Sequence, residues 1–298
     1  DGVDTFKAIS VGWYGDDEQV HEGLINQPAT AKLSQDGSIE AWADTDDGRR
    51  GSEIRASTDR ELGLEAEFVG ENGSADFRAW GELENRVDSP VQSVDDFSTD
   101  LVAWRRMQFE GEFDLPGGTK QLEGLCYFQR VCLDVPLFPW KWVWAVFPDG
   151  TAFSAFVPFV GPQLFRRGYR FFDSTRFERA TVPIRHSGLW DSATGEKVIS
   201  FDSATVEPVF DGSEHPQFEV TVSDDAGNRV GFRAASYGHA RNYIERPLLG
   251  GRFDSHWSYN EYLFRTENLR GRIDGEPLSD ATMGQGFGTL EYACGLSL

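Results

Sequence analysis

Hydrophobic residues alternate with polar or small residues at a period of two through much of this chain, and helical periodicity is hard to find anywhere. The clearest case is the segment 140–147, which reads Trp-Lys-Trp-Val-Trp-Ala-Val-Phe. Successive side chains of an extended strand point to opposite sides. Trp140, Trp142 and Trp144 therefore share one face. Such a pattern buries its apolar side only when strands pair into a sheet, so the chain is predicted to be a β protein.

Turn signals separate the strand-like segments and predict hairpins. Pro-Asp-Gly at 148–150 leads from the tryptophan segment into the apolar run 151–160. Two further hairpins are predicted around the turns at 116–118 and 224–228, and the last strand is predicted at 288–293. Many short strands joined by glycine-rich turns are typical of barrels and sandwiches. The predicted fold class is therefore all-β and mainly antiparallel.

Two segments depart from this pattern. Residues 96–106 are predicted to form a short helix, because suitable capping residues stand at its start. Around 163–183 the sequence becomes basic and irregular before strand signals resume. We place a domain boundary there, which gives an N-terminal β domain at 1–178 and a C-terminal β domain at 179–298.

The charge balance excludes several classes of partner. The chain carries 49 acidic and 28 basic residues, for a formal net charge of −21. Such a surface repels phosphate backbones, so nucleic-acid binding is not expected. The apolar runs are too short to cross a bilayer, so no membrane insertion is expected either. An acidic surface with few lysines suits a high-salt cytoplasm, and we expect a halophilic source.

The cysteines and histidines predict neither disulfide bonds nor a metal site. Cys126, Cys132 and Cys294 are odd in number and lack CxxC spacing, so a disulfide framework and a zinc site are not indicated. A reducing, cytoplasmic compartment fits best. The five histidines show no metal-ligand spacing. No metal and no other cofactor is predicted, and the oligomeric state is left open.

Familiar catalytic motifs are absent from the sequence. The glycine-rich stretch 284–288 leads into a predicted strand rather than a helix, so it indicates a tight turn and not a dinucleotide site. A GxSxG elbow and an HExxH helix are also missing. Hydrolase and metalloprotease functions lose support.

One carboxylate stands in an aromatic setting. If 256–262 is a strand, Trp257, Tyr259 and Glu261 face one side, and His256 lies on the other. A carboxyl group among aromatic rings would lose hydration, and its raised pKa would let it act as a general acid. The alternative is that Glu261 reaches solvent or pairs with an arginine.

The three tryptophans of 140–147 also have two interpretations. They could fill a barrel core, which is the commoner use of large aromatic side chains. They could instead form the wall of a pocket for a flat apolar ligand and stabilise a developing carbocation through their π faces. Both interpretations stay open at this point.

Three stretches resemble a known superfamily. They are Glu-Gly-Leu-Cys-Tyr-Phe-Gln-Arg at 123–130, the Trp-rich stretch 138–144 with the turn 148–150, and the closing stretch 286–292. They are similar to the lipocalin-like superfamily of tocopherol cyclase, the carotenoid 1,2-hydratases and AttH-type proteins. The resemblance implies two lipocalin-like β-barrel or sandwich domains. It also implies cofactor-free chemistry on isoprenoid-like substrates, in which protonation of a double bond precedes hydration or ring closure.

The chain departs from that superfamily at one point. Hydratase-like relatives tend to carry Asp-His-Asn-Trp after the Gly-aromatic strand, whereas Gln-Arg-Val-Cys stands here at 129–132. The missing histidine puts hydratase activity in doubt. Four side chains then remain as candidate acids: Glu261, His256, His239 and Glu291.

The leading hypothesis is an enzyme that binds an apolar isoprenoid-like molecule and starts cyclisation, isomerisation or hydration by proton transfer. Glu261 or His256 would donate the proton. The predicted substrate-binding residues are Trp140, Trp142, Trp144, Tyr127, Gln129, Tyr259 and Trp257. Two alternatives are a non-catalytic carrier of lipid or pigment and a carbohydrate-binding β protein. A carrier differs because its cavity needs no ionisable group.

The charge excess predicts a dependence of stability on salt. Unscreened repulsion among the excess negative charges opposes the compact state when salt is removed. We therefore expect the thermal midpoint to be lower in millimolar than in molar NaCl. A melting temperature that is the same in both would contradict the halophilic interpretation.

Overall fold

The computed structural model describes residues 3–14, 20–33, 39–45, 48–57, 61–69, 74–82, 86–94, 97–115, 117–133, 139–160, 180–181, 187–248 and 253–296. It separates into two compact units, Asp1–Asp134 and Val135–Leu298. The predicted domain boundary between residues 178 and 179 lies outside the described residues and stays a prediction.

The first unit is one antiparallel sheet. Its strands are β1 (Val3–Tyr14), β2 (Val20–Leu33), β3 (Ile39–Thr45), β4 (Gly48–Ser57), β5 (Glu61–Val69), β6 (Ser74–Glu82), β7 (Arg86–Val94), β8 (Phe97–Leu115) and β9 (Gly118–Leu133). They lie in the order β1-β2-β3-β4-β5-β6-β8-β7, and β9 pairs with β8. Most neighbours in the sheet are therefore neighbours in the sequence, as hairpin connections require. The predicted hairpin around 116–118 is confirmed as the β8–β9 pair.

The predicted helix at 96–106 is wrong, because this segment belongs to strand β8. Over this stretch β8 pairs with β7 on one side and with β9 on the other. Two ladders of backbone hydrogen bonds outweigh a local capping signal, which is worth about 1 kcal/mol.

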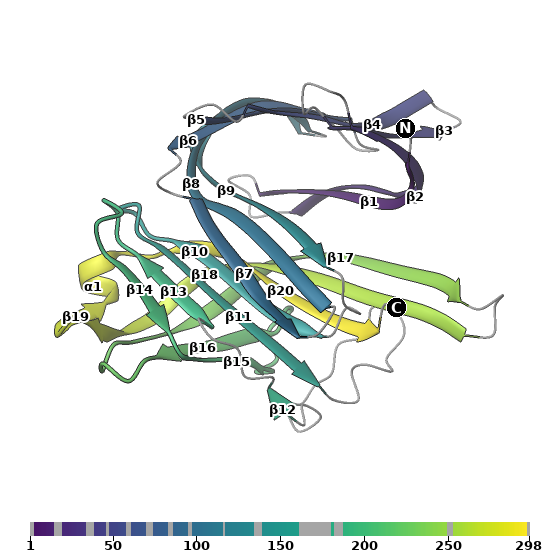
Figure 1. The fold of residues 1–298 in the computed structure, drawn as a ribbon. Coiled ribbons are helices and arrows are strands. Elements are labelled where there is room, and N and C mark those ends of the chain that lie inside the picture. Colours follow the sequence, from purple (N-terminus) through teal and green to yellow (C-terminus); the bar gives the residue numbers. More distant parts are fainter. Residues whose placement is uncertain are drawn as a thin grey trace. The chain divides into compact units, whose positions relative to one another are not determined.

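The second unit is a nearly closed antiparallel barrel (Figure 1). Its strands are β10 (Trp140–Val146), β11 (Ala152–Val160), β12 (Ala180–Thr181), β13 (Gly188–Asp191), β14 (Val198–Phe201), β15 (Ser203–Val209), β16 (Gln217–Ser223), β17 (Arg229–Leu248), β18 (Phe253–Ile273), β19 (Glu276–Ser279) and β20 (Phe287–Leu296). The sheet order is β14-β13-β11-β10-β20-β18-β17-β16-β15.

Two features close this barrel. The first strand of the unit, β10, pairs antiparallel with the last, β20, along Trp140–Val146. At the opposite side, β14 pairs with β13, and β15 pairs with β16. Only Asp202 separates β14 from β15 in the sequence, so the chain passes almost directly from one end of the sheet to the other. The result is an up-and-down arrangement in which only the short strands β14 and β15 end the sheet.

The inner face of the barrel carries one hydrophobic cluster. Its members come from one side of the barrel strands and include Val143, Phe153, Phe218, Phe264 and Leu290. Along β10 the exposure alternates as predicted, with Lys141, Val143 and Ala145 buried and the three tryptophans partly buried. The tryptophans thus lie on the outer face, opposite the core cluster. They do not fill the barrel core.

The all-β fold class is confirmed. The ladders of the described strands are antiparallel, and the described residues contain one helix, the four-residue α1 (Asp280–Met283). The predicted hairpins at 140–160 and 218–234 and the predicted last strand are also present. The described part of the chain contains no helix with the length and apolar character needed to span a membrane.

The ladder between β10 and β20 tolerates no side chain at Gly288. A Cβ there would meet the carbonyl oxygen of Trp144 and lie 2.7 Å from Cζ of Phe264. We expect Gly288→Ala to lower the free energy of unfolding by about 1–3 kcal/mol, the cost typical of overpacking. Urea denaturation measures it. Gly231→Ala is the matched control, because the nearest atom to its Cβ would be at 3.6 Å. Equal stability of the two variants would refute the close packing at this ladder.

Candidate functional site

Two glutamates face each other on the outer face of the barrel. In the ladder between β18 and β20, Glu261 is directly opposite Glu291. In the next ladder, Glu291 is directly opposite Trp142 of β10. Residues that pair directly share a face of the sheet, and their Cβ atoms are about 5 Å apart. The two carboxyl groups and the tryptophan indole therefore form one row across three strands.

Glu291 is buried, with 8% of its surface exposed, and two donors hold its carboxylate. The indole nitrogen Nε1 of Trp140 donates a hydrogen bond of 2.9 Å to Oε2 of Glu291. The Tyr259 hydroxyl donates a second hydrogen bond to the same carboxyl group. An indole N–H can only donate, so Oε2 of Glu291 acts as an acceptor toward Trp140.

Glu261 is partly buried and held from the neighbouring strand. Thr289 of β20 donates a hydrogen bond of 2.7 Å from its hydroxyl to Oε1 of Glu261. The prediction that Glu261 shares a face with Tyr259 is consistent with the strand register, which pairs these residues with Glu291 and Ala293 respectively. The predicted alternative, an ion pair of Glu261 with an arginine, is not present among the described side chains.

Burial sets the protonation of this pair. It raises the pKa of Glu291 to about 7, against the hydrogen bonds from Tyr259 and Trp140, and the nearby Glu261 adds to the rise. Burial also raises the pKa of Glu261, while the bond from Thr289 lowers it. The pKa of Tyr259 is raised, first by burial and then by the two glutamates. Near neutral pH the pair therefore retains a proton that a solvent-exposed pair would have lost.

Aromatic rings surround the Trp140 end of this row. The ring centroid of Trp140 lies 4.9 Å from that of Trp257 and 6.4 Å from that of Phe156. Trp257 is buried, whereas Phe156 is 37% exposed. We call the set Trp140, Tyr259, Glu261, Thr289 and Glu291 the carboxyl site.

The structure brings together some predicted site residues and leaves others apart. Trp140, Tyr259 and Glu261 belong to the carboxyl site, and Trp142 is opposite Glu291 in the ladder. Tyr127 is partly buried on β9 of the first unit. The side chains of Gln129 and His256 lie outside the described residues. The roles assigned to all of these residues stay predictions.

Sequence reasoning found Glu291 only as one of four candidate acids and missed Thr289. Glu291 lies 30 positions after Glu261, and only the register of β20 against β18 makes them neighbours. A signal was present, because Glu291 and Thr289 alternate with the apolar Leu290 in the predicted last strand. That alternation gives the face of a residue but not its cross-strand partner.

Two other places in the described part of the chain suit the predicted chemistry less well. An open hollow of about 690 Å³ on the sheet of the first unit is lined largely by charged residues, and Arg78 there pairs with Glu110. That lining is unfavourable for an apolar ligand. Among the described residues, a group of three or more histidine, cysteine or acidic side chains able to hold a metal ion is not found.

Comparisons with known proteins give likenesses of fold. No protein-family model and no curated protein sequence matches the chain. Solved structures similar to it include one provisionally assigned as AttH from Nitrosomonas europaea, with 14% identity over 97% of this chain and 90% of that chain and a TM-score of 0.45. CghA with Sch210972 has 10% identity over 97% and 80% of the two chains and a TM-score of 0.49. Kievitone hydratase from Nectria haematococca has 11% identity over 87% of each chain and a TM-score of 0.31.

With TM-scores below 0.5, these likenesses carry no inference about what this chain binds or which reaction it performs.

Proposed function

We propose that this chain is an enzyme that protonates an apolar, isoprenoid-like substrate at the carboxyl site and so starts cyclisation, isomerisation or hydration. The observation that carries the proposal is the directly opposed pair Glu261 and Glu291, with the pKa of Glu291 raised to about 7. A general acid works best when its pKa lies near the pH at which it operates.

The contacts of the pair suit the transfer of a proton to carbon. Trp140 and Tyr259 hold Glu291 in one orientation, so the acid needs no rearrangement when a substrate arrives. When Glu291 gives up its proton, the same two donors stabilise the carboxylate that forms. Glu261 remains beside it and favours return of the proton at the end of the cycle.

The surroundings suit an electron-rich apolar substrate. Protonation of an alkene leaves a carbocation, and the π faces of indole rings stabilise a nearby positive charge. Trp140 and Trp257 supply such faces beside the acid. Water then adds to the cation, a proton leaves from a neighbouring carbon, or a second double bond attacks it, which gives hydration, isomerisation or cyclisation respectively.

The first test is chemical. Purified protein is incubated in D₂O with a panel of linear isoprenoid alkenes, and the products are analysed by mass spectrometry for carbon-bound deuterium. Glu291→Gln keeps shape and hydrogen bonding but removes the acid, so we expect deuterium incorporation to fall by at least about 100-fold, as loss of a general acid typically causes. Glu267→Gln is the matched control, because Glu267 is an exposed glutamate on the same strand as Glu261.

Two results would contradict the enzyme proposal. One is full turnover in Glu291→Gln. The other is retention of an isoprenoid by the wild-type protein with no deuterium incorporated into it, which is what the carrier hypothesis expects.

The second test measures the raised pKa through stability. The folded pKa of Glu291, about 7, lies above the ordinary value of 4.5, so between these values the folded state binds more protons than the unfolded state. Stability contributed by this group is therefore highest below pH 4.5 and falls as the pH rises to 7. Relative to Glu291→Gln, the wild type should lose about 3 kcal/mol between pH 4.5 and pH 8, measured by urea denaturation.

The double variant Glu261→Gln/Glu291→Gln is a second reference for this measurement, because neither glutamate of the pair titrates in it. A stability difference between wild type and Glu291→Gln that stays constant over this pH range would show that Glu291 titrates normally. The acid would then have to be another group.

A further inference from the structure

The two glutamates of the carboxyl site differ in how deeply they are buried. Glu291 is buried, whereas Glu261 is only partly buried. Removing a carboxylate from water costs more free energy than removing a neutral carboxyl group. When the pair holds a single proton, burial therefore favours the proton on Glu291 and the negative charge on Glu261.

The hydrogen bonds to Glu291 act against this order. The indole of Trp140 donates to Oε2 of Glu291 at 2.9 Å, and the Tyr259 hydroxyl donates to the same carboxyl group. Such bonds stabilise a carboxylate more than a neutral acid. Burial alone therefore does not decide which glutamate is ionised, and a donor to Glu261 has a direct effect on where the proton resides.

Thr289 is such a donor. It lies two positions before Glu291 on β20 and is directly opposite Leu263 of β18, so it reaches Glu261 diagonally across the ladder. Its hydroxyl donates to Oε1 of Glu261 at 2.7 Å. A hydroxyl group has one proton to give, so this bond commits the donor of Thr289 to Glu261.

A β-bulge in β17 determines which side chain faces Glu261 from the other side. The register of β17 against β18 shifts at 236–238, and after this bulge Ala240 is directly opposite Glu261. His239 faces the core side, where a hydrogen bond of 3.1 Å joins its Nε2 to Oδ1 of Asn260. The imidazole thus points away from the pair, and the side chain opposite Glu261 on β17 is neither charged nor polar.

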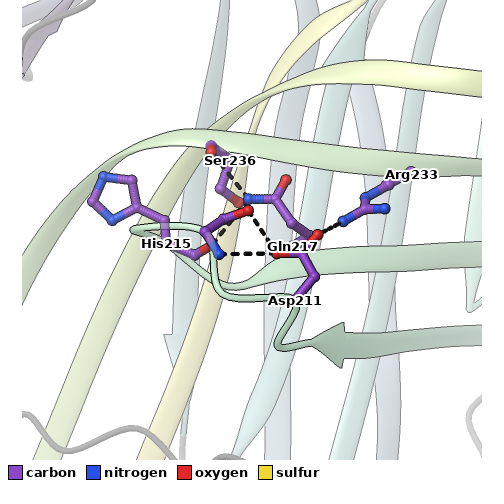
Figure 2. Close-up of polar contacts among 6 residues, drawn as sticks. Asp211, His215, Gln217, Arg233 and Ser236 are labelled. Carbon is purple, nitrogen blue, oxygen red and sulfur yellow. Dashed lines mark hydrogen bonds and ion pairs between the residues drawn. The ribbon is translucent and has the colours of Figure 1, made fainter.

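The basic side chains of the neighbouring strands are engaged elsewhere. Arg233 of β17 pairs with Asp211 in the loop between β15 and β16 (Figure 2). Arg265 of β18 has its Cζ 4.9 Å from the ring centroid of Tyr237. Lys141 of β10 is buried on the core side, where it donates to a backbone carbonyl oxygen. Among the described residues, an ion pair of either glutamate with a basic side chain is not present, so burial and hydrogen bonds decide where the charge resides.

We propose that Thr289 is a positioning residue that directs the single proton of the pair to Glu291. Its hydroxyl stabilises Glu261 as the carboxylate, and the charge on Glu261 disfavours ionisation of Glu291 directly opposite. Thr289 thus acts on the proposed general acid through Glu261. This role rests on the proposed function, because it matters for turnover only if Glu291 is the acid.

The directions of the pKa shifts agree with this role. Burial raises the pKa of both glutamates, and it is the largest cause in each case. The bond from Thr289 lowers the pKa of Glu261, and Glu261 adds to the rise at Glu291. Without the hydroxyl, the proton would reside on Glu261 for part of the time, away from the indole that holds Glu291 in one orientation.

The test follows the titration of each glutamate by carbon-13 NMR. The full-length protein carries the label at the glutamate carboxyl carbons, and Glu261→Gln and Glu291→Gln assign the two resonances. In the wild type we expect Glu261 to titrate at lower pH than Glu291. Thr289→Val keeps the shape but removes the donor, so it should raise the midpoint of Glu261 by about one pH unit, which is typical of one hydrogen bond to a carboxylate.

Two variants control for a merely structural effect. Thr289→Ser keeps the hydroxyl and should restore the wild-type midpoint of Glu261. Thr221→Val makes the same change at an exposed threonine of β16 and should leave this midpoint unchanged. Circular dichroism verifies the fold of each variant.

Three results would overturn the proposal. They are a wild type in which Glu261 titrates at higher pH than Glu291, an unchanged midpoint of Glu261 in folded Thr289→Val, and equal shifts in Thr289→Val and Thr289→Ser. The first result needs no substitution of Thr289, so the proposal stays testable if Thr289→Val does not fold. The titration needs no substrate, whereas the proposed activity is read from deuterium incorporation, so failure of one is distinguishable from failure of the other.

Discussion

The ladder between β10 and β20 is the interaction on which the second unit depends. It joins strands that lie about 150 positions apart in the sequence, and without it the meander from β10 to β20 would be an open sheet with two exposed edges. Closing such a long loop costs entropy, which the ladder recovers only when the whole register forms together. The same ladder brings Trp142 opposite Glu291 and Trp140 within hydrogen-bond distance of it. Closure of the barrel and assembly of the carboxyl site are therefore one event.

Alternation of side chains gives the barrel wall two chemically different faces. On β18, Glu261 faces outward, while Asn260 and Tyr262 on either side of it face the core. A single strand thus supplies both an acid in an aromatic surface and the amide that orients an imidazole. The backbone between them is rigid, since β18 pairs with β17 on one side and β20 on the other. The two faces share a scaffold but no side chains, so substitutions on one face need not disturb the other.

The sequence predicted the parts of this arrangement that depend on period and turn chemistry. The two faces of 140–147, the hairpin that follows, and the shared face of Tyr259 and Glu261 all follow from alternation along one strand. The prediction failed at 96–106, where long-range pairing in β8 overrides local capping residues. It also could not give the opposition of Glu261 and Glu291, because register between distant strands is set by the closed sheet and leaves no local trace. Cross-strand hydrogen bonds such as Trp140 to Glu291 have the same origin.

The bulge near Ser236 has a consequence for how the long strand β17 can vary. Before it, Ala234 and Ser236 face the core, and after it His239 does, so the parity of inward positions changes from even to odd at Tyr237. One inserted residue therefore sets the phase of everything between it and the hairpin that joins β17 to β18. If the same residues paired with β18 without the bulge, Ala240 would face inward and His239 would face outward. Which side chains line the barrel interior therefore depends on the register of β17 as well as on its sequence.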